Sequence, residues 1–197
     1  MSIELSTTEK VRRLPWALAN SACNIVFCSL GIFGSVFMLF LDEIGLDKGQ
    51  IGFLLSLFPF SGVIALLVGP LIDRIGIKRT FLVFWTLRKL VVALLIATPW
   101  VYSRHGSSGA FYFVAVIVSL FAICRAVAET AWYPWVQEYV PNSIRGKFTA
   151  MSSVLSTGAG ILSMSLASLV LRSSEHVSRF VWLFSIAVTF GLTRSLA

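Results

Sequence analysis

The chain has 197 residues, of which 57% are hydrophobic and only 13% are charged, and its mean hydropathy is +0.86. A soluble domain has about half apolar and a quarter charged residues, so this composition excludes an ordinary soluble protein and indicates a membrane protein. The net charge of +7 would suit a nucleic-acid partner if the basic residues formed one surface patch. They stand instead between long apolar segments, where they orient a membrane protein, so no nucleic-acid partner is expected.

Six apolar segments are each long enough to form a helix across a bilayer core of about 30 Å, which takes roughly 20 residues. Only helices and closed barrels satisfy their backbone hydrogen bonds in lipid, and these segments are too long for barrel strands. The predicted fold class is therefore all-α: a polytopic membrane protein whose six-helix bundle covers residues 15–197, after a cytoplasmic tail of residues 1–14. The predicted spans are Pro15–Phe40, Ile51–Ile72, Phe81–Val101, Ala110–Trp135, Phe148–Leu171 and Phe180–Leu196.

Lysine and arginine are distributed unevenly between the two sides of these spans, and the richer side is expected to be cytoplasmic. The richer side carries Lys10, Arg12, Arg13, Arg74, Lys78, Arg79, Arg145, Lys147 and Arg194. The opposite side carries Lys48, Arg104, Arg172 and Arg179. We therefore expect a multi-pass protein of a plasma or inner membrane with a cytoplasmic N-terminus.

The connection between the second and third spans has the residues of a tight turn between two helices. Gly69 would allow close approach of another helix, and Gly76 would allow a backbone with positive φ. Asp73 is placed to accept hydrogen bonds from a helix N-terminus or from an arginine. A basic turn that only fixes membrane orientation is the alternative interpretation.

Two motifs in these connections resemble those of the major facilitator superfamily of secondary transporters. The run G-x-L-x-D-R-x-G-x-K-R, which begins at Gly69, is similar to the loop after the family's second helix, although Ile72 and Ile77 depart from its usual pattern. The run E-x-x-P-x-x-x-R-G, which begins at Glu138, resembles the motif between the family's fourth and fifth helices. The cytoplasmic gate motif implied by this resemblance comprises Gly69, Asp73, Arg74, Gly76, Lys78, Arg79, Glu138, Pro141, Arg145 and Gly146.

The resemblance implies that the chain is the N-terminal six-helix half of a twelve-helix transporter that moves small solutes by alternating access. In this family the two loops form a charge network that closes the cytoplasmic side while the cavity faces outward, and such ion pairs form in one state and break in the other. The implied partners are the lipid bilayer, a small-molecule substrate and the missing C-terminal half. The network would consist of Asp73, Arg74, Glu138 and Arg145, and four unrelated interfacial charges are the alternative.

Polar residues in the first and fourth spans are candidates for lining a substrate path. Asn20 and Asn24 lie one turn apart on a polar face of the first span, and such a face turns toward protein or water. Hydrogen bonds between helices are the alternative role for these asparagines. Arg125 and Glu129 lie one turn apart in the fourth span, where they would either contact the substrate or pair with each other.

Arg88 and Lys89 lie in the third span, about two turns from its predicted cytoplasmic end. Adjacent helical residues point about 100° apart, so we expect at least one of them to snorkel to the membrane interface. The other would face the cavity and, together with Arg125, would favour anionic substrates. The substrate and cavity candidates are thus Asn20, Asn24, Arg88, Arg125 and Glu129.

Two further groups of residues predict packing. Small residues recur at helical spacing in the fifth span, which predicts a close contact with another helix. Trp132, Tyr133 and Trp135 flank Pro134, which predicts an aromatic belt at the membrane interface, with a ligand cage as the alternative. The small residues are Ser153, Ser156, Gly160, Ser163 and Ala167.

The sequence carries no pattern typical of enzymes or metal proteins. Its three cysteines form no C-x-x-C pair, so neither a disulfide framework nor a metal site is predicted, and no cofactor is expected. H-E-x-x-H and G-x-S-x-G are absent, so catalysis is not expected. The alternative to a transporter half is a stand-alone six-helix membrane protein that acts as a dimeric half-transporter or scaffold.

Overall fold

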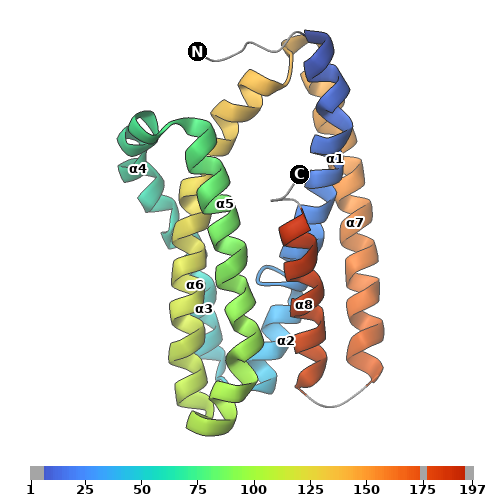
Figure 1. Cartoon of the computed structure of the whole chain (residues 1–197). Coiled ribbons are helices and arrows are strands. Elements are labelled where there is room, and N and C mark those ends of the chain that lie inside the picture. Colours follow the sequence, from blue (N-terminus) through green and yellow to red (C-terminus); the bar gives the residue numbers. More distant parts are fainter. Residues whose placement is uncertain (1–6, 174–176, 194–197) are drawn as a thin grey trace.

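The computed structural model describes residues 7–173 and 177–193, and every regular element among them is a helix (Figure 1). The all-α prediction is therefore confirmed. The helices are α1 (Thr7–Leu30), α2 (Ser35–Glu43), α3 (Lys48–Phe60), α4 (Gly62–Ile75), α5 (Ile77–Ala93), α6 (Thr98–Tyr139), α7 (Arg145–Ser173) and α8 (Ser178–Thr193), with 3-10 helices at Leu94–Ala97 and Asn142–Ile144.

Four helical stretches in the described part of the chain are long and apolar enough to cross a membrane. The apolar helix Ser178–Leu192 is shorter, and the predicted end of the sixth span at Leu196 lies outside the described residues. The third and fourth predicted spans fall within one of the four stretches, so helix length and composition do not confirm six spans. The four stretches are Leu14–Glu43, Lys48–Pro70, Ile77–Gln137 and Asn142–Arg172.

The first and second predicted spans are both interrupted helices, which the apolar pattern did not indicate. The first is broken between α1 and α2, where Gly34 takes an extended conformation with φ −92° and ψ 171°. A Cβ atom at Gly34 would lie 1.9 Å from the carbonyl oxygen of Ser29, so the break requires glycine. The second is divided at Ser61, which joins α3 to α4.

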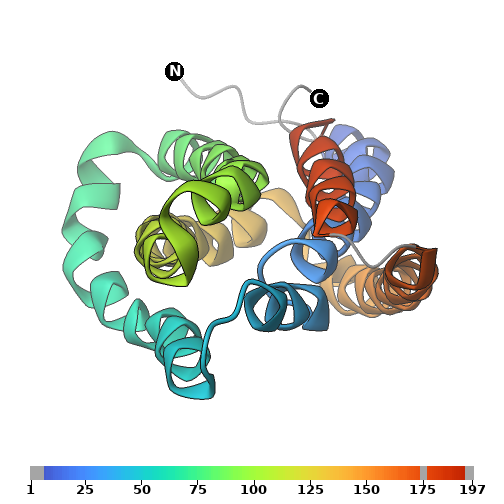
Figure 2. The same cartoon turned by 90° about the horizontal axis from the view of Figure 1, so that it is seen from below.

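The chain reverses direction within the first part of α6. Gly106, near the start of α6, has φ +67° and ψ −167°, a conformation that suits glycine and interrupts the helix. After this residue α6 runs back along α5, and the two helices lie side by side (Figure 1). Seen end-on, α3 and α4 lie at one end of the molecule and α7 at the other, with α5, α6, α1 and α8 between them (Figure 2).

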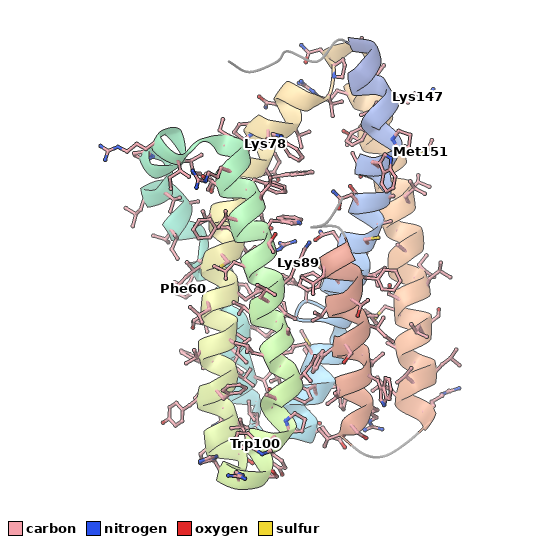
Figure 3. All side chains as sticks on the ribbon, in the orientation of Figure 1. Phe60, Lys78, Lys89, Trp100, Lys147 and Met151 are labelled. Atoms are coloured by element: carbon pink, nitrogen blue, oxygen red, sulfur yellow. The ribbon has the colours of Figure 1, made fainter. Side chains whose placement is uncertain are left out.

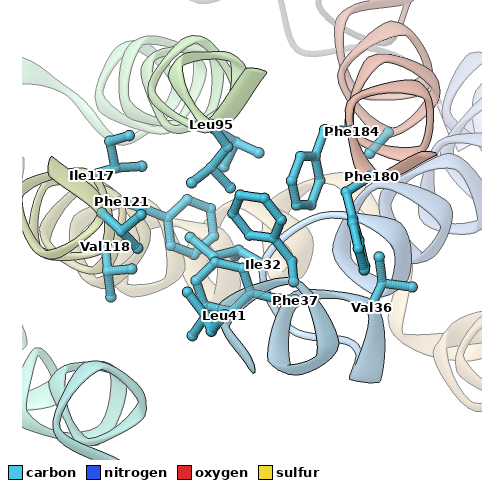
Figure 4. Packing of buried hydrophobic residues seen from close by; sticks show 14 of the residues in the cluster. Ile32, Val36, Phe37, Leu41, Leu95, Ile117, Val118, Phe121, Phe180 and Phe184 are labelled. Carbon is cyan, nitrogen blue, oxygen red and sulfur yellow. The ribbon is translucent and has the colours of Figure 1, made fainter. Parts of the chain in front are cut away.

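The main hydrophobic core joins the segment around the α1–α2 break to the 3-10 helix after α5 and to α6 and α8 (Figure 4). Ile32 and Phe37 come from the first of these regions, Leu95 from the second, and Phe121 and Phe184 from the helices. These five side chains are almost completely buried. The core thus holds the broken first span against α6, which carries Arg125.

Trp132 and Trp135 are half-buried and pack against aromatic rings of α5, so part of each ring contacts protein and not a membrane interface. Their ring centroids lie 5.2 and 5.0 Å from that of Phe81, and Trp132 also stacks on Trp85 at 6.0 Å. Tyr133, by contrast, is exposed. A helix turns about 100° per residue, so Trp132 and Trp135 share the face toward α5 and Tyr133 points away from it.

The small-residue face of α7 packs against α1, as predicted. Ser163 and Ala167 are buried, and a Cβ atom at Gly160 would meet Ile25 of α1 at 3.5 Å. Ser153 is exposed, so the packing face begins beyond it. Small side chains allow the backbones of two membrane helices to approach closely, which explains the contact between α1 and α7.

Candidate functional site

A cavity of about 650 Å³ lies between the α3–α4 segment and α6. Ligand sites in proteins typically occupy about 300–1,000 Å³, so the space suits a small solute. Its charged and hydroxyl-bearing lining comes from α6 and from the junction of α3 and α4. The lining residues are Phe58, Pro59, Ser61, Gly62, Ala65, Arg125, Ala126, Glu129, Thr130 and Tyr133.

Arg125 and Glu129 form an ion pair at the wall of this cavity. Arg125 Nε donates a hydrogen bond to Glu129 Oε1 at 2.6 Å, and the two side chains are 28% and 44% exposed. The Arg125 guanidinium also lies over the ring of Phe33, 4.6 Å from its centroid. Phe33 belongs to the break between α1 and α2, so the interruption of the first span places an aromatic ring against the charged pair.

The two aliphatic hydroxyl groups of the cavity are hydrogen-bonded to nearby backbone carbonyls. Ser61 Oγ donates to the carbonyl oxygen of Phe58 at 2.7 Å, and Thr130 Oγ1 donates to that of Ala126 at 2.8 Å. Each hydroxyl donates its proton to a backbone carbonyl oxygen, so the lone pairs on the hydroxyl oxygen stay available to accept hydrogen bonds. The two groups therefore act as hydrogen-bond acceptors toward any solute in the cavity.

Arg88 lies in the protein interior and not in the cavity lining. Its Nη2 donates to Asn24 Oδ1 at 2.6 Å, which joins α5 to α1. Its guanidinium carbon lies 3.4 Å from the ring centroid of Trp85 and 5.8 Å from that of Phe27. The Arg88–Asn24 contact is a hydrogen bond between two helices. This is the alternative role that the sequence allows for the asparagines of the first span.

The prediction that Arg88 or Lys89 snorkels to the interface is wrong, because the two residues are only 2% and 1% exposed. α5 packs against both α6 and α8, so side chains that point about 100° apart on α5 are both covered by protein. Lys89 is labelled in Figure 3. Asn20 is half-buried and does not line the cavity, and its Oδ1 has no hydrogen-bond partner among the described residues.

The two predicted gate loops lie at the same end of the bundle, as Lys78 and Lys147 show in Figure 3. Gly76 has φ +93° between α4 and α5, which confirms the predicted positive φ. Its N–H donates to the carbonyl oxygen of Ile72 at 2.8 Å, and the N–H and hydroxyl of Thr80 both donate to the Gly76 carbonyl at 3.0 Å. The loop is therefore a closely hydrogen-bonded turn.

Other parts of the predicted gate differ from expectation or are not tested. Apart from its chain neighbours and its own helix backbone, no described atom lies within 4 Å of the position that a Cβ atom would take at Gly69, so the close helix approach predicted there is not found. Arg145 Nη2 donates to carbonyl oxygens at the end of α6, those of Gln137 at 3.2 Å and Val140 at 3.4 Å. The side chains of Asp73 and Glu138 lie outside the described residues. The remaining gate residues are exposed or half-buried: Arg74, Lys78, Arg79, Pro141 and Gly146.

The sequence prediction missed several residues at the cavity. Thr130 and Tyr133 lie one and two helical turns beyond Ala126 on the face of α6 that carries Glu129, so helical spacing could have included them. Ser61 and Phe33 could not have been found this way. Their positions depend on helix breaks that the apolar pattern does not indicate. Within the described residues, no group of three or more His, Cys, Asp or Glu is placed to hold a metal ion.

The chain is similar to known transport proteins in sequence and in fold. The family model of the Major Facilitator Superfamily matches residues 21–194. The fold is similar to the crystal structure of a bacterial homologue of the iron transporter ferroportin in its outward-facing state, with a TM-score of 0.70 and 20% sequence identity.

This structural match covers 100% of the chain and 47% of the ferroportin homologue, so the chain spans about half the length of that protein. No curated protein matches the chain. At this identity the structural likeness shows the fold alone, whereas the family model covers most of the chain and includes both loop motifs. The chain therefore belongs to the major facilitator superfamily and is a multi-pass membrane protein.

Proposed function

We propose that this chain forms the N-terminal half of a secondary transporter that moves a small solute by alternating access. The observation that carries the proposal is the cavity beside the partly exposed Arg125–Glu129 pair, set among strongly apolar helices. Charged residues inside membrane-spanning helices are costly and mark substrate or ion paths. Membership of a family of membrane transporters supports the same function.

The proposed topology has six membrane crossings. As a single helix, the stretch Ile77–Gln137 would be roughly 90 Å long at 1.5 Å per residue, about three times the thickness of a bilayer core. The reversal at Gly106 supports its division into two crossings, made by α5 and by the rest of α6. The apolar helix Ser178–Leu192 would supply the sixth crossing. Local thinning of the bilayer would compensate for the short length of this helix.

The proposed orientation has the N-terminus and both basic loops in the cytoplasm. The common location of Lys78 and Lys147 at one end of the bundle supports this arrangement, because cytoplasmic loops are enriched in lysine and arginine. In the proposed cycle Asp73, Arg74 and Glu138 would contribute to a cytoplasmic gate. Arg145, which already holds the end of α6, would position that helix end within the gate.

The second half of the proposed transporter would be another six-helix bundle. The stretches Lys48–Pro70 and Asn142–Arg172 have only 17% and 11% of their most apolar window buried, against 44% and 50% for the other two. These two stretches therefore have the most surface left for a second bundle or for lipid. Rocking of two bundles about a site between them would open the cavity to each side of the membrane in turn.

The proposal is tested by solute counterflow into liposomes that contain this chain together with the second six-helix bundle that completes the transporter. We expect saturable uptake that falls at least about tenfold in Arg125→Gln, since a charged hydrogen bond in a partly desolvated site contributes roughly 1.5–3 kcal/mol. Arg104→Gln is the matched control: Arg104 is exposed at the α5–α6 turn, over the ring of Trp100, and outside the cavity. Equal uptake by the wild type and Arg125→Gln would contradict the proposal.

A further inference from the structure

We propose that the cavity at Arg125 and Glu129 takes a zwitterionic solute, one that carries an anionic group and an ammonium group on the same molecule. This inference rests on the transport function proposed above and names the substrate class of the same site. It departs from the anion preference that the sequence predicts. That preference requires Arg88 or Lys89 to face the cavity beside Arg125.

The described wall of the cavity is balanced in charge. Of its lining residues, Arg125 is the cation and Glu129 the anion, and both are partly exposed. Arg88 does not line the cavity, since it is 2% exposed and bound to Asn24. The site therefore offers one positive and one negative group, and it has no excess of positive charge.

Both members of the pair have hydrogen-bonding capacity to spare. Among the described residues Arg125 donates through Nε, so the four N–H groups on its two Nη atoms are available for a carboxylate. Glu129 accepts through Oε1, which leaves Oε2 for an ammonium N–H. The hydroxyl oxygens of Ser61 and Thr130 are acceptors, and they suit the remaining N–H groups of an ammonium.

A solute of a single charge fits this wall poorly. An anion drawn to Arg125 would also meet the Glu129 carboxylate, which lies 2.6 Å from Arg125 Nε. A cation drawn to Glu129 would meet the guanidinium in the same way. In a partly desolvated site such like-charge contacts oppose the attraction and select against the wrong solute. A zwitterion satisfies both groups at once.

The remaining wall provides apolar surface and holds the arginine in place. Phe58 and Ala65 line the cavity, and the Phe33 ring lies 4.6 Å from the Arg125 guanidinium carbon. A cation over an aromatic face is stabilised by the ring, so Arg125 is held in position before a solute arrives. An apolar substituent between the two charged groups of the solute would lie against this surface.

Isothermal titration calorimetry on the full chain in lipid nanodiscs tests the proposal with two matched series of probes. One series is built on alanine and the other on leucine, which sample a small and a large substituent. Each contains the free amino acid as the zwitterion, its N-acetyl derivative as the anion and its amide as the cation. The variants are Arg125→Gln, Glu129→Gln and the double exchange Arg125→Glu with Glu129→Arg, with Arg104→Gln as the control.

We expect the wild type and Arg104→Gln to bind at least one free amino acid about tenfold or more tightly than its two derivatives. Glu129→Gln should shift the preference toward the N-acetyl derivative, and Arg125→Gln should shift it toward the amide. The double exchange should keep the preference for the zwitterion, because the wall still carries one charge of each sign. Circular dichroism of each variant establishes that it is folded.

Equal or tighter binding of either derivative by the wild type would overturn the proposal, and so would failure to bind any of the six probes. Counterflow with the same probes separates this inference from the transport function. Binding of a free amino acid without its counterflow would contradict transport and leave the ligand class standing. Counterflow of a derivative that bears a single charge, in preference to the free amino acid, would support transport and overturn the proposed ligand class.

Discussion

Two arginines on neighbouring helices of this bundle have opposite surroundings. Arg88 on α5 is almost completely buried, donates to Asn24 of α1 and lies 3.4 Å from the ring centroid of Trp85. Arg125 on α6 is 28% exposed, pairs with Glu129 of its own helix and lines the cavity. The first joins two helices, and the second has no described hydrogen-bond partner for the donors on its two Nη atoms.

The difference shows what each arginine can contribute. A desolvated cation is tolerated only when the surrounding groups satisfy it, so the Arg88 contacts form a side-chain link between α5 and α1. A partly exposed pair at positions i and i+4 contributes only about 0.3–0.5 kcal/mol to stability. The pair therefore adds little to the stability of the fold, and its unused Nη and Oε2 groups remain for a solute.

Loss of the ring beneath Arg88 should have the largest effect on stability. Trp85→Leu removes a buried ring that contacts Arg88, Phe81 and Trp132, and we expect the free energy of unfolding to fall by roughly 2–4 kcal/mol. Reversible unfolding in mixed micelles measures this change. Trp182→Leu is the control, since Trp182 is exposed on α8 and should cost less than about 0.5 kcal/mol.

The two asparagines of α1 sharpen the comparison, because they lie one turn apart on the same helix. Asn24→Ala leaves the buried Arg88 without the acceptor of its described hydrogen bond and should lower the free energy of unfolding by about 1.5–3 kcal/mol. Asn20→Ala removes an Oδ1 atom that has no partner among the described residues and should cost less than about 0.5 kcal/mol. Equal losses in the two variants would show that the Arg88–Asn24 bond contributes nothing specific.

Loss of the ring beside Arg125 should lower the free energy of unfolding less than loss of the ring beneath Arg88. Phe33→Leu removes a half-exposed ring that contacts Arg125, Phe58 and Phe121, and we expect a loss of about 0.5–1.5 kcal/mol in unfolding free energy. The same micelle unfolding experiment provides the measurement. A loss as large as that of Trp85→Leu would mean that the two arginines are equally embedded, against the contrast drawn above.

Composition and periodicity were enough to predict the helical class and the presence of several apolar helices long enough to cross a membrane. They also predicted the positive φ of Gly76 and a close helix contact on the small residues of α7, though not which helix makes it. These features depend on local chemistry: apolar length, the conformational freedom of glycine, and the size of side chains along one helix face. The motif resemblance added the family, which the comparisons confirmed.

The sequence could not predict features that depend on which helices surround one another. Both Arg88 and Lys89 are buried because α5 lies between neighbours on more than one side, and a single helix gives no sign of this. The break at Gly34 was missed because an isolated glycine is common in continuous membrane helices. That break brings Phe33 to Arg125, so this part of the candidate site could not be predicted from the sequence either.

The most direct test of the contrast between the two arginines is the free energy of unfolding of Arg88→Gln and Arg125→Gln, measured side by side in the same micelles. The substitution is identical, so the two values differ only through their surroundings. We predict that Arg88→Gln lowers the free energy of unfolding by about 2 kcal/mol or more and Arg125→Gln by less than about 1 kcal/mol. Equal losses, or a larger loss for Arg125→Gln, would contradict the assignment of Arg88 to packing and Arg125 to the site.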